Sequence, residues 1–299
     1  MAQVHQLDKR LVRDRFRKCF RQAGNAGIIQ PRMAERLVDL LLRYCPERSY
    51  GNVLEIGCGT ASLAPELLKH VSIDNWVAND IVPLAEDLYK AVGKLPLKHY
   101  SFLHGDMEHV DFPGEQDLIV SNAAIQWATS FADLFEHLVQ KLSRGGVLAF
   151  STFGPENLRE VSELTGLSLN YVESSTYASL MPDRGEILCV EDEPAVVEFD
   201  SAVDVLRHLK QTGVNSLARR AWTPGDLRSF SEEYHARFTV PSGSSCKTDV
   251  PVHTGQVRTP VLQGKETEEC GSGTTRGAGV SLTYHPVYVV FRRHGLEGS

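Results

Sequence analysis

The sequence predicts an α/β fold of the Rossmann-like type, in which helices cover both faces of a mostly parallel sheet. Two observations support this prediction. Short apolar runs recur over residues 53–151, and segments long enough for helices separate them. Several of these runs also end in a glycine or a polar residue, which would gather such groups at the carboxyl edge of the sheet. That edge is where open parallel sheets bind their ligands.

The first predicted strand, residues 53–56, includes Glu55 and leads into a glycine turn. The turn consists of Gly57, Cys58 and Gly59. A helix-like stretch follows at residues 61–70. The glycines permit a tight turn and let a ligand approach the backbone closely. Ser62 replaces the third glycine of the dinucleotide pattern G-x-G-x-x-G, which disfavours NAD. On these residues alone, a plain turn between strand and helix remains an alternative.

The second predicted strand, residues 75–80, ends in Asp80, where a carboxylate can accept both hydrogens of a ribose diol. The third, residues 101–107, ends with Asp106 and Met107. An aspartate there can accept a hydrogen bond from an adenine amino group while the thioether packs on the ring.

Residues 117–122 and 145–151 read as the fourth and fifth strands, and Asn122 ends the fourth. Each polar strand end taken singly also fits a solvated residue or a helix cap. A succession of polar strand ends at helix-length intervals favours a binding cleft.

This order of motifs over about residues 30–152 resembles the class I S-adenosylmethionine (SAM) methyltransferases. Later stretches narrow the resemblance to the malonyl-acyl carrier protein O-methyltransferases of biotin synthesis. The similar stretches are residues 121–127, 151–160, 205–213 and 282–285. In two places the sequence departs from that family. Ala61 replaces the usual last glycine of the first motif, and Ala23 stands where a site-closing tyrosine is expected.

The resemblance implies a seven-strand sheet, a helical lid and SAM as the cofactor. The implied cofactor-binding residues are Glu55, Gly57, Cys58, Gly59, Asp80, Ile81, Asp106, Met107 and Asn122. It also implies methylation of the free carboxylate of malonyl-acyl carrier protein to its methyl ester. Two alternatives are a methyltransferase for a free small dicarboxylate of the aconitate type and a non-catalytic binding or assembly protein that keeps the fold.

Methyl transfer to a carboxylate needs no general base, because the carboxylate is already ionised at neutral pH. The protein must instead align the reacting atoms and exclude water. Asn122 and Gln126 are candidates to hold polar groups, and Trp127 to wall the pocket. Tyr284 and His285 are candidates to reach the site from the last strand. The alternative for Trp127 is ordinary core packing, and Tyr284 and His285 are alternatively ordinary residues on a strand face.

Composition indicates a globular protein, with 42% hydrophobic and 23% charged residues. A net charge of −7 disfavours nucleic acid as a main partner. No apolar stretch approaches the ~20 residues that span a membrane. Neither a signal-peptide core nor a metal-binding cysteine spacing is evident, so we expect a cytoplasmic monomer with reduced thiols and no metal site.

An N-terminal helix is predicted over residues 4–22, with Leu7, Leu11, Phe16 and Phe20 on one side. Its basic row is a candidate docking surface for the acidic carrier protein, and Arg219 and Arg220 are a second candidate. The row consists of Arg10, Arg13, Arg17 and Arg21. A merely solvated face is the alternative.

The expected domain comprises residues 1–240 and 280–299, with residues 1–30 and part of 170–238 forming the lid. A last strand is expected over residues 280–291, antiparallel at the sheet edge. Between these parts, residues 241–279 contain 20 Gly, Pro, Ser or Thr residues and no aromatic residue. Such a segment buries too little apolar surface to offset its ordering entropy, so we expect a flexible insertion.

Overall fold

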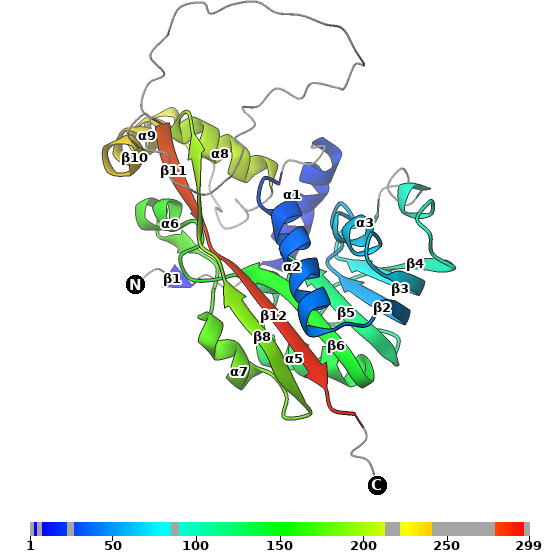
Figure 1. The fold of residues 1–299 in the computed structure, drawn as a ribbon. Helices are drawn as coiled ribbons and strands as arrows, with labels where there is room; N and C mark the ends of the chain where they lie inside the picture. Colours follow the sequence, from blue (N-terminus) through cyan, green and yellow to red (C-terminus); the bar gives the residue numbers. More distant parts are fainter. Residues whose placement is uncertain are drawn as a thin grey trace, which may run out of the picture.

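The computed structural model describes residues 3–4, 8–22, 27–84, 90–212, 222–240 and 279–295. Its centre is a seven-stranded sheet (Figure 1). In spatial order the strands are β4 (His99–His104), β3 (Ser72–Asp80), β2 (Ser49–Ile56), β5 (Gln116–Asn122), β6 (Leu142–Phe153), β12 (Pro286–Arg293) and β8 (Gly185–Asp192). The predicted seven-strand α/β fold is thus confirmed.

Five neighbouring strands, β4 to β6, are parallel, and β12 runs antiparallel to β6. The antiparallel direction of the last strand agrees with the prediction, but its place at the edge does not. β8 pairs with the outer side of β12 and takes the edge position itself. Paired on both sides, β12 is an almost wholly apolar strand, and Val287 and Val289 are fully buried.

Helices pack on both faces of the sheet (Figure 1). α2 (Gln30–Tyr44) and α3 (Leu63–Leu67) share one core with the sheet, whereas α5 (Phe131–Lys141) and α7 (Tyr177–Leu180) share the other. α2 shows how the sequence specifies this arrangement. Pro31 occupies its first turn, and Met33, Leu37 and Leu40 recur at helical spacing and are fully buried.

A second, three-stranded antiparallel sheet lies in and beside the part of the chain that the sequence predicts to contribute to a lid. Its order is β10 (Thr239–Val240), β11 (Gly279–Tyr284) and β9 (Ala195–Phe199). α8 (Ala202–Gln211) and α9 (Pro224–Phe238) lie beside it (Figure 1). Because β8 precedes β9 and β11 precedes β12, a long antiparallel ribbon connects the lid to the main sheet.

The remaining elements are short or lie near the lid. They are α1 (Lys9–Gln22), α6 (Arg159–Thr165), the strands β1 (Gln3–Val4) and β7 (Leu167–Ser168), and the 3-10 turns η1 (Ile125–Trp127) and η2 (Ser174–Thr176). No helix within the described ranges is long and apolar enough to cross a membrane.

Several element boundaries differ from prediction. The expected single strand over residues 280–291 divides into β11 and β12 at His285, whose carbonyl accepts from the Gly154 N–H and whose N–H donates to Asn157 Oδ1. Its backbone is therefore bonded to the loop after β6 and not to a neighbouring strand. The same loop precedes α6, which begins at Arg159. The predicted insertion lies outside the described residues, except that Gly279 begins β11.

Candidate active site

The loop after β2 is shaped by three residues with positive φ angles. Gly57 and Gly59 adopt +67° and +52°, and Ala61 adopts +56°. A Cβ on Gly57 would lie 2.2 Å from the Ala124 side chain, so the close packing of these two loops requires glycine. Ala61 accepts a conformation that costs of order 1–3 kcal/mol for a residue other than glycine. Its N–H still donates to the Cys58 carbonyl at 2.7 Å, so this departure from the family pattern leaves the turn intact.

Asp80 lies at the carboxyl end of β3, and its carboxylate braces the glycine loop. Oδ2 accepts from the Gly59 N–H at 2.9 Å, and Oδ1 accepts from the Val82 N–H at 2.8 Å. The residue is only 7% exposed, and this burial raises the pKa of its carboxyl group, an effect that the backbone hydrogen bonds partly offset. The sequence placed Asp80 in the cofactor site, and the structure puts it on the wall of a cavity.

Glu55 lies beneath the glycine loop and does not line the cavity. It is 2% exposed, and its Oε2 accepts from the Trp76 indole N–H at 3.1 Å. Burial raises the pKa of Glu55 to about 8, although the Trp76 hydrogen bond acts in the opposite direction. Glu55 is therefore mainly protonated at neutral pH, and its immediate partner is a core tryptophan.

The cavity opens at the carboxyl ends of the parallel strands and has a volume of about 200 Å³. Of the residues predicted from the sequence, those that line it are Gly57, Cys58, Gly59, Asp80, Ile81, Asp106, Met107, Asn122 and Trp127. The structure thus gathers residues from four separate strand ends at one place. We call this side of the cavity the strand-end wall.

The opposite side, which we call the lid wall, was not predicted as part of the site. It consists of Lys9, Val12 and Phe16 from α1, and Gln211 and Thr212 at the end of α8. Gly27, Gln30 and Pro31, which precede and begin α2, complete the lining near α1. The sequence signals for these residues were the apolar side of α1, which included Phe16, the family-like stretch 205–213, and the predicted lid over residues 1–30 and part of 170–238. Val12, which did not belong to that predicted side, is the buried residue there, at 2% exposure.

Lys9 joins α1 to the strand-end wall. Its Nζ lies 3.0 Å from Asp106 Oδ1 and 2.6 Å from Glu108 Oε2. Glu108 also accepts from the N–H groups of Thr129 and Ser130, both at 2.9 Å. Burial alone would raise the pKa of Glu108, but these hydrogen bonds and Lys9 outweigh it and lower the pKa. The ion pairs thus connect α1, the loop after β4 and the loop before α5.

Aromatic contact closes the same end of the cavity. The rings of Phe16 and Trp127 lie perpendicular, with centroids 5.3 Å apart. Trp127 is 8% exposed and also belongs to the core on the α5 face. It therefore serves both the pocket and the core packing that the sequence offered as alternatives.

Two polar residues near Trp127 use most of their hydrogen-bonding groups in bonds to other parts of the protein. Asn122 Nδ2 donates to the Gln30 carbonyl at 3.0 Å, and its Oδ1 accepts from the Ser151 hydroxyl at 2.6 Å. Asn122 still lines the cavity. Gln126 does not, because its amide donates to the Ala123 carbonyl at 2.7 Å and accepts from Thr152 at 3.3 Å. The expectation that Gln126 faces the pocket is corrected accordingly.

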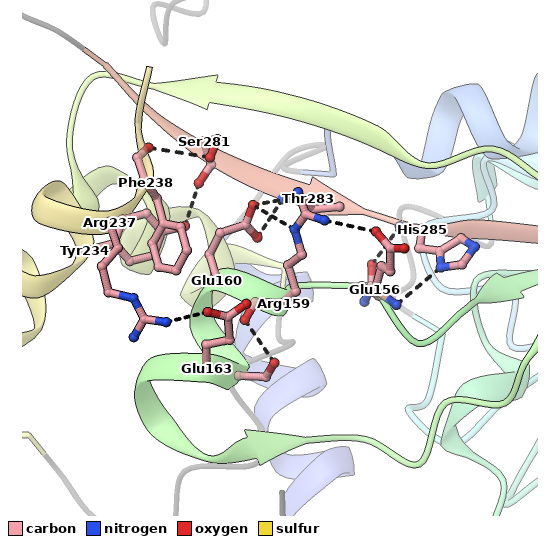
Figure 2. Close-up of polar contacts among 12 residues, drawn as sticks. Glu156, Arg159, Glu160, Glu163, Tyr234, Arg237, Phe238, Ser281, Thr283 and His285 are labelled. Carbon is pink, nitrogen blue, oxygen red and sulfur yellow. Dashed lines mark hydrogen bonds and ion pairs between the residues drawn. The ribbon is translucent and has the colours of Figure 1, made fainter. Parts of the chain in front are cut away.

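Tyr284 and His285 also lie away from the cavity lining. The Tyr284 hydroxyl is 2.6 Å from His208 Nε2, inside the lid. His285 Nδ1 accepts from the Glu156 N–H at 3.2 Å (Figure 2). Its Nε2 lies 3.5 Å from Asp192 Oδ2. Both residues mark the junction between β11 and β12, and their contacts with His208 and Glu156 hold the side chains within the surrounding structure.

The predicted docking arginines are only partly described. Arg10 and Arg17 are exposed on α1, and Arg13 is partly buried, with its Nε 3.5 Å from Asp14 Oδ1. The side chain of Arg21, and Arg219 and Arg220 altogether, lie outside the described residues, as does Ala23. The described residues contain no group of three His, Cys, Asp or Glu side chains placed to hold a metal ion.

Comparison with known proteins identifies the class and then the family. A family model described as a methyltransferase domain matches residues 54–150, which includes the strand-end wall from Gly57 to Asn122. The YcgJ protein of Bacillus subtilis shares the fold, with a TM-score of 0.51 and 12% identity over 88% of this chain and 99% of that one. The fold and site thus define a methyltransferase.

Curated relatives give the family. The malonyl-[acyl-carrier protein] O-methyltransferase of Haemophilus influenzae is 35% identical over 99% of both chains. The protein of the same name in Prosthecochloris aestuarii is 32% identical over 97% of this chain and 96% of its own. This chain belongs to the malonyl-[acyl-carrier protein] O-methyltransferase family, as the sequence resemblance indicated.

Proposed function

We propose that this protein transfers a methyl group from SAM to the free carboxylate of malonyl-acyl carrier protein, an early step of biotin synthesis. The observation that carries the proposal is the strand-end wall, built on a chain whose family membership extends over its whole length. We also propose that it acts in the cytoplasm as a monomer.

The chemistry of the strand-end wall fits SAM. Asp80 presents a braced carboxylate for a ribose diol, and Asp106 with Met107 offers an acceptor and an apolar contact for an adenine ring. The Gly57–Gly59 loop lets a ligand approach the backbone closely. When bound, SAM supplies an electrophilic methyl group. Glu55 supports this wall from below through Trp76 and has no direct ligand role in the proposal.

The protein's own task is then to position the substrate and exclude water. The substrate carboxylate is ionised at neutral pH and needs no general base. Val12, Phe16 and Trp127 provide an apolar enclosure, and Lys9 attaches α1 to Asp106 in the strand-end wall. Esterification removes a charge that would be costly to bury in the apolar pockets of chain-elongating enzymes.

The defining experiment incubates purified protein with methyl-labelled SAM and malonyl-carrier, followed by mass spectrometry of the carrier. The expected result is the addition of one labelled methyl group to the malonyl-carrier and none to the carrier without the malonyl group. Equal transfer to free malonate or aconitate would favour the small-dicarboxylate alternative. Binding of SAM without transfer to any of these acids would favour the non-catalytic alternative.

We further propose that α1 receives the acidic carrier protein on its outer, basic side. Arg10, Arg17 and Lys18 are exposed there, on a chain that is itself net negative. Arg13 and Arg21 continue the row, and Arg219 and Arg220 remain the second candidate. Because α1 also contributes the lid wall, a carrier docked on it would lie next to the cavity.

Charge reversal tests this surface. Arg10→Glu with Arg17→Glu should raise KM for malonyl-carrier about 10-fold and flatten its salt dependence, since local attraction governs encounter. Turnover of a short malonyl thioester without carrier should change little. Lys94→Glu with Arg144→Glu, exposed near the amino-terminal edge of the sheet, is the matched control. Equal effects on both substrates would show that the helix is merely structural.

A further inference from the structure

Three of the family-like sequence stretches meet on β11, outside the cavity. Residues 151–160 supply Glu160, residues 205–213 supply His208, and residues 282–285 supply Thr283 and Tyr284. Thr283 donates to Glu160 twice, from its N–H at 2.9 Å and from its hydroxyl at 2.6 Å (Figure 2). Glu160 is 1% exposed, so this pairing fixes β11 firmly to α6. β11 can therefore serve as a rigid support for the elements that its side chains contact.

Tyr284 extends this support to α8. Its hydroxyl lies 2.6 Å from His208 Nε2, and the two residues are 2% and 6% exposed. Burial lowers the pKa of His208 to about 4, so the imidazole is neutral at neutral pH and can accept the hydroxyl proton. A buried hydrogen bond between residues 76 positions apart constrains the rotation of α8 about its axis.

His208 stands one helical turn before the part of α8 that reaches the cavity. The Thr212 N–H donates to the His208 carbonyl at 3.0 Å, and the Thr212 hydroxyl lies 3.2 Å from the same oxygen. Gln211 and Thr212 are the described residues through which α8 lines the cavity. Any displacement of His208 is therefore transmitted directly to the lid wall.

We propose that Tyr284 and His208 are positioning residues that hold the end of α8 so that Gln211 and Thr212 form the acyl-substrate side of the cavity. This inference rests on the proposed function and deepens it. The strand-end wall provides the groups suited to SAM, which leaves the amide and hydroxyl of the lid wall to contact the malonyl group. Substrate affinity then depends on the hydrogen bond between Tyr284 and His208, neither of which contacts the substrate.

The test compares two tyrosine hydroxyls that each join β11 to a helix, Tyr284 to α8 and Tyr234 to α9. Tyr284→Phe removes the bond to His208, whereas Tyr234→Phe removes a bond to the Ser281 carbonyl at 2.7 Å. Tyr284→Phe should raise KM for malonyl-carrier about 5- to 10-fold and leave kcat and the calorimetric Kd for SAM within about twofold. Tyr234→Phe should leave all three values unchanged. His208→Gln, whose amide can still accept from Tyr284, should retain more substrate affinity than His208→Leu.

Amide hydrogen exchange provides a readout that needs no turnover. In Tyr284→Phe the Thr212 amide should exchange faster, while Tyr234→Phe should leave it unchanged. Equal KM increases in the two variants, a parallel loss of SAM affinity, or unaltered exchange at Thr212 would each overturn the positioning role. Absence of methyl transfer by the unmodified enzyme would instead overturn the proposed function, and the exchange experiment would still decide the role of Tyr284.

Discussion

The two walls of the cavity are built in different ways. The strand-end wall comes from loops that directly follow neighbouring strands of one sheet, and hydrogen bonds between its own residues, such as Gly59 N–H to the Asp80 carboxylate, brace it internally. The lid wall comes from α1 and α8, which lie about 200 residues apart in sequence. Single side-chain interactions hold it, namely Lys9 with Asp106, Phe16 with Trp127, and His208 with Tyr284.

This difference suggests that the two walls have separate roles, one in binding the cofactor and the other in binding the acyl substrate. The residues suited to a cofactor are held mainly by the sheet, and Lys9 is a lid-wall residue that also contacts them, through Asp106. The residues suited to the acyl substrate depend on the way the lid packs, and small changes far from the cavity can move them. Substitutions in the strand-end wall should therefore affect SAM affinity or global stability, whereas lid substitutions should affect substrate use with modest effects on stability.

The largest expected effect concerns the support of the strand-end wall. The pKa of Glu55 is raised to about 8 in the folded protein from 4.5, so stability present below pH 4.5 is lost as pH rises toward 8. At about 1.36 kcal/mol per pKa unit, this loss reaches about 5 kcal/mol. Glu55→Gln should abolish this pH-dependent loss. Urea denaturation should therefore show that the free energy of unfolding of the variant, relative to that of the unmodified protein, is larger at pH 8 than at pH 5.

The Glu35→Gln substitution, at an exposed position on α2, serves as the control. If the stability difference between Glu55→Gln and the unmodified protein is the same at both pH values, Glu55 is ionised in the folded state. The strand-end wall would then rest on a buried charge.

A second prediction concerns the strand-end wall itself. Asp80→Ala should weaken SAM binding by ~1–3 kcal/mol, or roughly 5- to 150-fold, because the ribose hydroxyls lose a charged acceptor and the Gly59 loop loses its brace. Calorimetry measures the change directly. Asp74→Ala, on the same strand but at its amino-terminal end, should bind SAM normally. Unchanged affinity in Asp80→Ala would exclude Asp80 from the cofactor site.

The sequence predicted one wall far better than the other, for a physical reason. Strands, glycine turns and acidic strand ends are local patterns, and a parallel sheet brings consecutive strand ends together without further information. Gly57, Asp80 and Asp106 could therefore be predicted to share one cavity. The seven-strand fold followed from the same pattern and from the family resemblance.

The lid wall depends on which surfaces of distant elements meet, and no local pattern specifies that. The apolar residues of α1 suggested a buried side, but Val12 and not Leu11 is the buried residue because Lys9 and Phe16 fix the rotation of the helix. Gln126 and Tyr284 were predicted to reach the site, but neither lines the cavity. Each is polar and near the expected site in sequence, but its hydrogen bonds direct it into the protein.

A third prediction tests how α1 is attached to the rest of the cavity. Lys9→Met should weaken SAM binding and substrate use about 2- to 5-fold, since partly exposed ion pairs contribute only about 0.5–1 kcal/mol. High salt should weaken the Lys9 ion pairs in the unmodified protein, so SAM affinity should fall with salt there. The variant lacks these ion pairs and should not show this salt-dependent fall. Lys94→Met, at an exposed position outside the cavity lining, is the control. Normal binding at low salt in Lys9→Met would mean that Phe16 alone holds α1 in place.

The smallest effect is expected for the segment between β10 and β11, which the sequence predicts to be a flexible insertion. Val240 and Gly279 are direct antiparallel partners, so a short loop can join the two strands. Deleting residues 243–277 leaves Pro241, Ser242 and Ala278, and one added glycine completes a loop of ordinary length. Thermal unfolding and KM for malonyl-carrier should both stay nearly unchanged, because the deleted composition offers little apolar surface to a core. A large fall in the unfolding temperature would show that the segment packs on the domain, whereas normal stability with a raised KM would add it to the lid wall.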